Sequence, residues 1–186
     1  MSEYQDILDF WFEEVDRSLW FHMKDGSFDV LVKDRYLERY EQARDGTFDH
    51  WASEPEGVLA LCLLLDQFPR NIFRGKAEAF ATDAKILEIV KEAIDKGFDQ
   101  ELEPIKRRFL YLPFEHSEEL ENQKRSVELF ASMKEIDPEG YDYALRHFDI
   151  IERFGHFPQR NVALGRDMSN EEQEYLEELA QAGRNY

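Results

Sequence analysis

The chain has 186 residues, 42% of them hydrophobic and 14% aromatic, which excludes a disordered segment and suits a single globular domain over residues 1–186. Its formal net charge of -18 excludes the basic surface that binding to nucleic acid or to an anionic membrane requires. The one cysteine, Cys62, cannot form a disulfide within the chain, and the longest apolar run, residues 58–65, is shorter than the roughly 20 residues of a membrane span. Because the N-terminus also lacks a signal-peptide pattern, we expect a cytoplasmic protein.

The first half of the sequence contains four stretches with apolar residues at helical spacing. Ser2 and Gln5 have the spacing of a capping box at the start of the first stretch. The third stretch is apolar on all sides until Asp66, so we expect it at the centre of the fold, with a break at Pro69. The four predicted helices run from Ser2 to Val15, from Phe28, after an Asp25-Gly26-Ser27 turn, to a stop at Gly46, from Pro55 to Asp66, and from Thr82 or Asp83 to Gly97.

The second half contains four further helical stretches, whose ends are marked by proline, glycine and capping residues. Ser117, followed by two glutamates, is a typical helix start. Ser169 and Glu172 have the spacing of a second capping box. The predicted helices run from Pro104 to near Pro113, from Ser117 to near Asp137, from Pro138 to a stop at Gly155, and from Asn170 to about Ala180.

No segment alternates apolar and polar residues in the manner of a β-strand. Eight helices joined by short loops favour antiparallel neighbours that stack in pairs. The predicted fold is therefore all-α, an αα-superhelix of about eight antiparallel helices. The sequence has no clean 34-residue repeat, so it does not by itself indicate an ideal tetratricopeptide array.

A short proline motif occurs twice, each time after a predicted helix. It reads Phe-Pro-Arg-Asn at residues 68–71 and Phe-Pro-Gln-Arg-Asn at residues 157–161. The proline ends a helix, the phenylalanine can anchor the turn in the core, and the asparagine can cap backbone groups. These roles leave the two arginines, Arg70 and Arg160, unexplained by the turn.

Positive charge is concentrated around these proline-containing turns. Residues 65–75, 106–126 and 146–166 together carry eleven Lys and Arg against seven Asp and Glu. A guanidinium group presents a planar fork of donors that matches carboxylate or phosphate oxygens, so several arginines in one cavity would bind an anion. The alternative is that these arginines form ion pairs that hold helix ends together. Their partners would then be Asp66, Glu115, Glu118 and Glu152.

His116 is the candidate for proton transfer, because imidazole titrates near neutral pH. Glu115 is its neighbour in sequence, but adjacent residues do not face each other on a helix. The carboxylate that orients His116 would therefore be Glu118 or one from another segment. The alternative is a histidine hydrogen-bonded at a helix junction. Ser117 lacks the strand and glycine-flanked elbow of a nucleophile and is better suited to capping a helix.

A metal site would require distant residues to converge. His116, His147 and His156 with Glu115 or Asp66 supply suitable ligand atoms. However, the sequence has neither an HExxH motif nor Glu-x-x-His sets on paired helices. We therefore expect no metal and no cofactor.

Several of these stretches are long and unusual in composition. They are LDFWF at 8–12, WF at 20–21, LLLDQFPRNIFRG at 63–75, FATD at 80–83, FLYLPFEHSE at 109–118, RSVELF at 125–130 and IIERFGHFPQRN at 150–161. In this order, over nearly the whole chain, they resemble the bacterial family known as domain of unknown function 924. The resemblance implies a tetratricopeptide-like all-α superhelix. It implies no reaction for any residue, because the family's biochemical role is not established.

Three functional hypotheses fit these features. The leading one is an arginine- and histidine-lined pocket that binds a small anionic ligand or an acidic peptide end. The second is a hydrolase or transferase in which His116 is the general acid or base, Glu115 or Glu118 orients it, and arginines stabilise charge. The third is a protein-interaction scaffold with a concave surface. No oligomeric state is implied. The ligand-binding residues would be Asp66, Gln67, Arg70, Asn71, Ser117, Arg153, Arg160 and Asn161.

Overall fold

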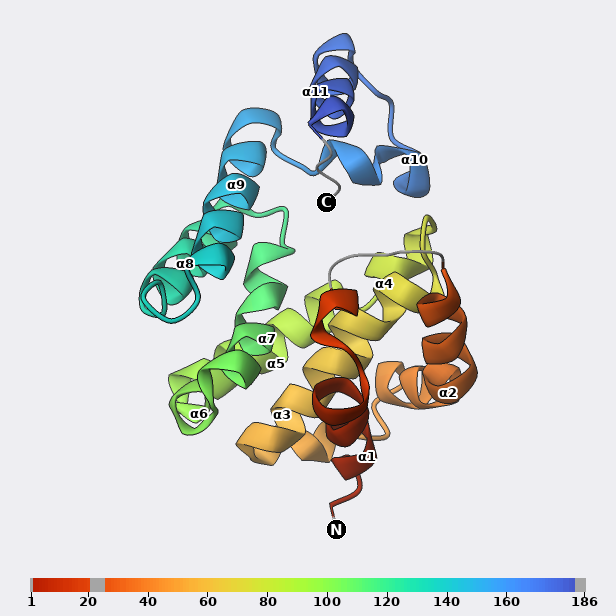
Figure 1. Cartoon of the computed structure of the whole chain (residues 1–186), viewed down its shortest axis with the longest axis vertical. Helices are drawn as coiled ribbons and strands as arrows, with labels where there is room; N and C mark the ends of the chain where they lie inside the picture. The colour runs from red at the N-terminus through yellow and green to blue at the C-terminus, as the bar shows by residue number, and fades with distance from the viewer. Residues whose placement is uncertain (1, 21–25, 183–186) are drawn as a thin grey trace. The chain divides into compact units, whose positions relative to one another are not determined.

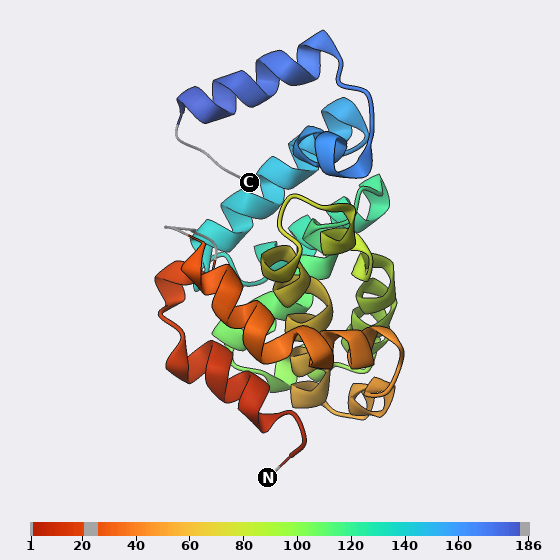
Figure 2. The same ribbon diagram turned by 90° about the vertical axis from the view of Figure 1, so that its right-hand side faces the viewer.

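Figure 1 and Figure 2 show the computed structural model of the chain, which describes residues 2–20 and 26–182. Within these residues every regular element is a helix and none is a strand, which confirms the predicted all-α class. Phe21 and Asp25, which belong to two of the stretches discussed above, lie outside the described residues. The chain divides into two compact units. Unit 1 comprises Met1–Arg74 and Glu78–Pro113, and unit 2 comprises Gly75–Ala77 and Phe114–Tyr186.

Unit 1 contains the first four predicted helices and most of the fifth, together with a short helix, α6, that was not predicted. Two of its helices continue into π-helical turns, η1 and η4. Three short 3-10 turns cover Arg17–Leu19, Asp49–Ser53 and Ala77–Phe80. The helical elements are α1 (Gln5–Asp9), η1 (Phe10–Glu14), α2 (Ser27–Arg44), α3 (Pro55–Cys62), η4 (Leu63–Gln67), α4 (Phe68–Ile72), α5 (Asp83–Asp95), α6 (Phe98–Glu101) and α7 (Pro104–Glu115).

The helix break expected at Pro69 does not occur. Helix α3 passes directly into the π turn η4, and α4 begins at Phe68 with the proline in its first turn. A proline is tolerated there because the first N–H groups of a helix have no partner within it. Asp66 and Gln67 therefore lie inside a continuous helical run and not in a loop. Because π turns are rare, no pattern in the residues of this segment indicates one.

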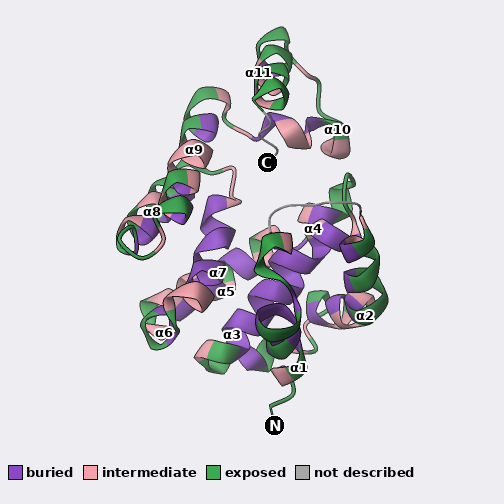
Figure 3. Cartoon of the chain, viewed as in Figure 1, coloured by how far each residue is buried: buried purple, intermediate pink, exposed green. Residues whose placement is uncertain are grey.

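The centre of unit 1 is the apolar run of α3 and η4, as predicted. Residues 58–65 are all fully buried, and Figure 3 shows most of α3 in the colour of buried residues. The aromatic face of the first helix packs on the end of this run: the ring centroids of Trp11 and Phe68 are 5.5 Å apart, and those of Phe10 and Phe68 are 6.2 Å apart. Burial of large aromatic side chains is the main source of stability here.

Unit 2 contains the last three predicted helices. The pair formed by α8 (Leu120–Ala131) and α9 (Pro138–Phe154) lies side by side in both ribbon views. Gly155, with φ of 73°, ends α9 in the left-handed conformation that favours glycine. A 3-10 turn (Pro158–Arg160) and α10 (Asn161–Leu164) follow, and α11 (Asn170–Gln181) begins at the predicted capping box of Ser169 and Glu172.

None of the helices in the described part of the chain is long and apolar enough to cross a membrane. The arrangement of the helices as a tetratricopeptide-like superhelix stays a prediction.

Candidate functional site

The predicted site residues fall into two groups, one in each unit. Unit 1 holds the residues from the first proline motif, and unit 2 holds those from the end of α7 and from the second proline motif. The first group is Asp66, Gln67, Arg70 and Asn71, and the second is Glu115, His116, Ser117, Glu118, Arg153, Arg160 and Asn161.

In unit 1, Arg70 is held by two carboxylates. Its guanidinium lies 3.1 Å from Asp66 Oδ1, one helical turn earlier, and donates two bonds of 2.9 Å to the oxygens of Asp83 at the start of α5. Gln67 donates a further bond to Asp66. Burial opposes the charged form of Arg70, but the charges of Asp66 and Asp83 outweigh burial and raise its pKa. This group therefore ties η4 and α4 to α5.

Two polar residues after Arg70, Asn71 in the motif and Arg74 just beyond it, contact α2. Asn71 donates a 2.8 Å bond to Asp29 Oδ1, and Arg74 makes a two-point contact with the same carboxylate at 2.6 Å and 2.9 Å. Asp29 lies 42 residues before Asn71, so this contact joins distant parts of the chain. In unit 1, both arginines of the motif region are bonded to carboxylates, which is the ion-pair alternative considered above.

In unit 2, the end of α7 is held by an amide from α8. Gln123, fully buried, donates from Nε2 to the carbonyl oxygens of Glu115 and Ser117, both at 2.6 Å. The last carbonyl groups of a helix have no partner within it, so this side chain satisfies them. Ser117 does not cap α8 as the N-cap residue, because α8 begins at Leu120. Its hydroxyl instead accepts bonds from the N–H of Glu119 and from Asn122.

A buried carboxylate and an imidazole meet between α7 and α9. Glu115 is 4% exposed, and its Oε1 lies 3.4 Å from Nδ1 of His147. The same Nδ1 is 2.9 Å from the carbonyl oxygen of Tyr143, one turn earlier on α9. The ring of His116 lies beside that of His147, with centroids 6.5 Å apart. The carboxylate of Glu115 is thus directed to the histidine of another helix, as helical geometry requires.

The second proline motif places Arg160 next to this group. Its guanidinium lies over the ring of Phe157, 4.5 Å from the centroid, and donates a 2.9 Å bond to the carbonyl oxygen of His116. Phe157 is fully buried, and its ring centroid is 5.4 Å from that of His147. The core phenylalanine expected of the motif therefore supports the arginine and the histidine together.

Glu118 connects the same turn to the segment after α10. It accepts the N–H of Phe157 at 3.0 Å and a two-point contact from Arg166 at 2.9 Å and 2.6 Å. Partial burial raises the pKa of Glu118, but the Arg166 bond, the Phe157 N–H and the charge of Arg160 outweigh burial and lower it. One carboxylate thus faces two guanidinium groups.

Asn161 and Arg153 contact α11 and not this group. Asn161 is fully buried and donates to Glu172 Oε1 at 3.2 Å, and His156 lies 2.5 Å from the same oxygen. Arg153 pairs with Glu171 at the exposed surface. Hydrogen bonds from the backbone and hydroxyl of Ser169, then from Asn161 and His156, lower the pKa of Glu172 to about 2. These contacts attach α11 to the end of α9.

Sequence reasoning missed the partners that lie far away along the chain. Asp29, Asp83, Gln123 and Glu172 carry no motif that pairs them with an arginine, a helix end or a histidine. His147 was considered only as a metal ligand, although its position on the buried side of α9 was a usable signal. Among the described residues, no three or more side chains of His, Cys, Asp and Glu lie together in a way that could hold a metal ion.

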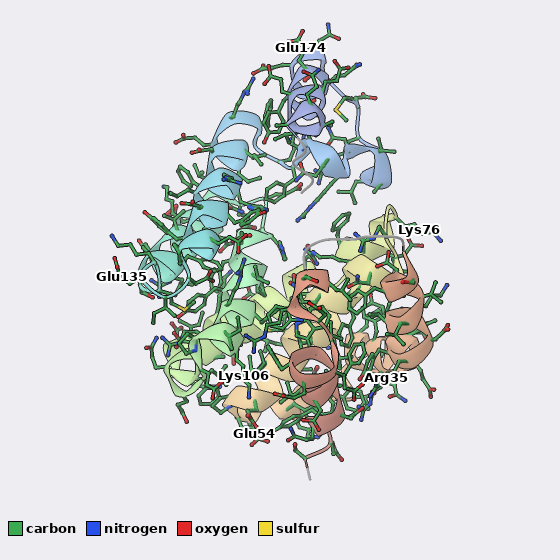
Figure 4. All side chains as sticks on the ribbon, in the orientation of Figure 1. Arg35, Glu54, Lys76, Lys106, Glu135 and Glu174 are labelled. Atoms are coloured by element: carbon green, nitrogen blue, oxygen red, sulfur yellow. The ribbon has the colours of Figure 1, made fainter. Side chains whose placement is uncertain are left out.

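Unit 1 also has a shallow cavity that none of these residues lines. Its volume is about 340 Å³, and it lies where α3 and α7 begin. Figure 4 labels two of its lining residues, Glu54 and Lys106. The others are Pro55, Glu56, Glu101, Leu102 and Glu103.

The fold and the paired groups define an all-α protein whose proline motifs build ion-paired helix junctions and one histidine-containing polar cluster. A model of the bacterial proteins of unknown function, DUF924, matches residues 7–180, and the chain belongs to that family. A solved structure, that of the protein of unknown function ATU0120 from Agrobacterium tumefaciens, is similar to it with a TM-score of 0.87 and 42% sequence identity. The match covers 94% of this chain and 97% of that one. The comparison with curated proteins finds no match.

Proposed function

We propose that unit 2 binds a small anionic ligand, a carboxylate or a phosphate, at the cluster formed by His116, His147, Phe157 and Arg160. This cluster is called the His116–Arg160 cluster below. The proposal is narrower than the sequence hypothesis, because it leaves out Asp66, Gln67, Arg70 and Asn71, whose polar groups are engaged in the junctions of unit 1.

The observation that carries the proposal is the sharing of Glu118 between two guanidinium groups. Arg166 forms the two-point bond to this carboxylate, and the charge of Arg160 also acts on it. An environment that lowers the pKa of a carboxylate stabilises negative charge, so this corner of unit 2 is suited to an anionic group. In a chain with a net charge of -18, a corner that stabilises negative charge is unusual.

The placement of Arg160 also suits anion binding. Its hydrogen bond to the His116 carbonyl fixes the position of the guanidinium. The stacking on Phe157 orders the planar group, so less side-chain entropy is lost when a ligand binds. Both His116 and Arg160 are only partly buried, which leaves them accessible to small solutes.

The test is a thermal-shift titration of the full chain with sulfate, phosphate and acetate. We expect saturable stabilisation of the wild type by at least one of these anions, since a ligand that binds only the folded state raises the melting temperature. Arg160→Ala should abolish the shift. Arg125→Ala is the matched control, because Arg125 lies in the same unit and pairs on the surface with Glu128.

An interaction scaffold is the alternative outcome of this test. If no anion stabilises the wild type, or if Arg160→Ala and Arg125→Ala respond equally, the cluster is a structural junction and the anion-binding proposal is wrong. Circular dichroism of each variant without ligand shows whether it has folded, so that loss of binding is not confused with loss of structure.

A further inference from the structure

Helix α8 buries two polar side chains on the face that packs into unit 2. Gln123 and Ser126 are both fully buried, and they lie three residues apart, so they are neighbours on one face of the helix. Among the described residues, neither Oε1 of Gln123 nor Oγ of Ser126 has a hydrogen-bond partner. A buried polar atom without a partner keeps its desolvation penalty, so two such atoms side by side indicate a shared ligand.

The orientation of the Gln123 amide is fixed by the end of α7. Its Nε2 donates to the carbonyl oxygens of Glu115 and Ser117, both at 2.6 Å. Exchange of the amide nitrogen and oxygen would place Oε1 against two carbonyl oxygens, which only accept hydrogen bonds. Turning the amide over therefore cannot satisfy Oε1, which requires a donor from elsewhere.

Helix α9 has a small apolar side chain at the level of Ser126. The two helices are consecutive, pack side by side and are joined by the short segment 132–137, so they run antiparallel (Figure 1). A Cβ at Gly140, near the start of α9, would lie 3.0 Å from the ring of Phe130, which sets the register of the pair. One turn back on α8 and one turn forward on α9, this register brings Ser126 to the level of the fully buried Ala144. Alanine has no polar group in its side chain, so it cannot satisfy the hydroxyl.

We propose that one buried water molecule binds between α8 and α9, donates a hydrogen bond to Oε1 of Gln123 and accepts one from the hydroxyl of Ser126. The two atoms require one donor and one acceptor, and a water molecule supplies both in the smallest volume. Side chains three residues apart on a helix have Cβ atoms about 5–6 Å apart, and two hydrogen bonds of about 2.8 Å through one water span such a separation.

This water links the cap of α7 to the interface between α8 and α9. Gln123 holds the last carbonyl groups of α7 through Nε2, and the water holds the other side of the same amide. An amide that is bonded on both sides keeps one rotamer, so Ser126 acts through the water as a positioning residue for the end of α7. Anion binding at the His116–Arg160 cluster is not needed for this role.

A crystal structure of the full wild-type chain, at a resolution that shows ordered water, tests the site directly. We expect one water molecule within about 3.2 Å of both Gln123 Oε1 and Ser126 Oγ. A structure in which no single water bonds both atoms would overturn the proposal. The Ser126 hydroxyl would then be expected to donate to the carbonyl oxygen of Asn122, one turn earlier on α8.

Hydrogen exchange of the Gln123 side-chain amide, followed by NMR of the full chain, tests the effect on the α7 cap. Ser126→Ala removes one partner of the water at nearly constant shape, and the Nε2 hydrogens should exchange about fivefold faster than in the wild type. Ser132→Ala is the matched control, because Ser132 follows the last residue of the same helix and its hydroxyl bonds the carbonyl oxygen of Leu129.

Equal exchange rates in Ser126→Ala and Ser132→Ala would contradict the positioning role of Ser126. Circular dichroism shows whether each variant has folded. If Ser126→Ala does not fold, the wild-type crystal structure still decides whether the water is bound.

Discussion

At the scale of single residues, the main feature of the chain is how its arginines are paired. In unit 1, Arg70 is held by Asp66 and Asp83, and neither Asp66 nor the guanidinium has much access to water: their side chains are 1% and 19% exposed. A buried charge that loses its partner keeps its desolvation penalty. Arg70 is therefore a structural residue in our account, while Arg160 is a binding residue.

Replacing Arg70 with alanine tests whether Arg70 is a structural residue. Arg70→Ala removes the cation that pairs with the buried carboxylate of Asp66 and should lower the free energy of unfolding by about 3 kcal/mol or more. Arg74→Ala removes a more exposed pair and should cost less than about 1 kcal/mol. Urea denaturation followed by circular dichroism measures both values. Equal costs for the two variants would contradict the structural role of Arg70.

At the scale of elements, the decisive feature of unit 2 is how its helix ends are capped. The end of α7 depends on the amide of Gln123, and the start of α11 depends on the Ser169–Glu172 capping box. The first cap sets the position of Glu115 and His116. The second attaches the C-terminal helix to Asn161 and His156.

Removing the first cap should destabilise the end of α7. Gln123→Ala leaves one buried and one partly buried carbonyl group without the amide that bonds them, and we expect a loss of about 2 kcal/mol in the free energy of unfolding. Gln173→Ala removes an exposed bond to Glu177 on α11 and should change stability by less than about 0.5 kcal/mol. Chemical denaturation measures the loss in the free energy of unfolding for each variant. If Gln123 caps α7, its replacement costs more than that of Gln173, whereas equal losses would show that the Gln123 bonds are incidental.

Because of the Ser169–Glu172 capping box, the stability of the fold should depend on pH in the acidic range. The pKa of Glu172 is about 2 in the folded chain against an ordinary value of 4.5. A lowered pKa means that the carboxylate stabilises the fold fully above pH 4.5, and that this contribution is lost as the pH falls from 4.5 toward 2. Melting temperatures across this range should fall more steeply for the wild type than for Glu172→Gln. Parallel curves would show that the capping box has no such effect.

At the scale of the whole molecule, local patterns were readable from the sequence and long-range partners were not. The Gly155 stop, the Ser169–Glu172 box and the buried third helix follow from spacing within one helix, so they were predicted. The π turn before Pro69 was missed because it depends on packing. The pairings of Asp29 with Arg74 and of Glu115 with His147 join residues far apart along the chain, which composition and periodicity do not specify.

The arginines of the two proline motifs also show that the sequence does not specify long-range partners. The two proline motifs look alike in sequence, yet Arg70 is bonded to Asp66 and Asp83 inside unit 1, while Arg160 stacks on Phe157, donates to the His116 carbonyl and acts on the charge of Glu118. The sequence predicted one shared role for both arginines. Their different surroundings assign structure to the first and, in our proposal, binding to the second.

The central claim is that an anion binds at the His116–Arg160 cluster of unit 2, and amide chemical-shift mapping during a sulfate titration tests it most directly. We predict saturable shifts centred on residues 115–118 and 157–161, absent in Arg160→Ala. Saturable shifts centred on residues 66–71, or no saturable shift at all, would contradict the claim.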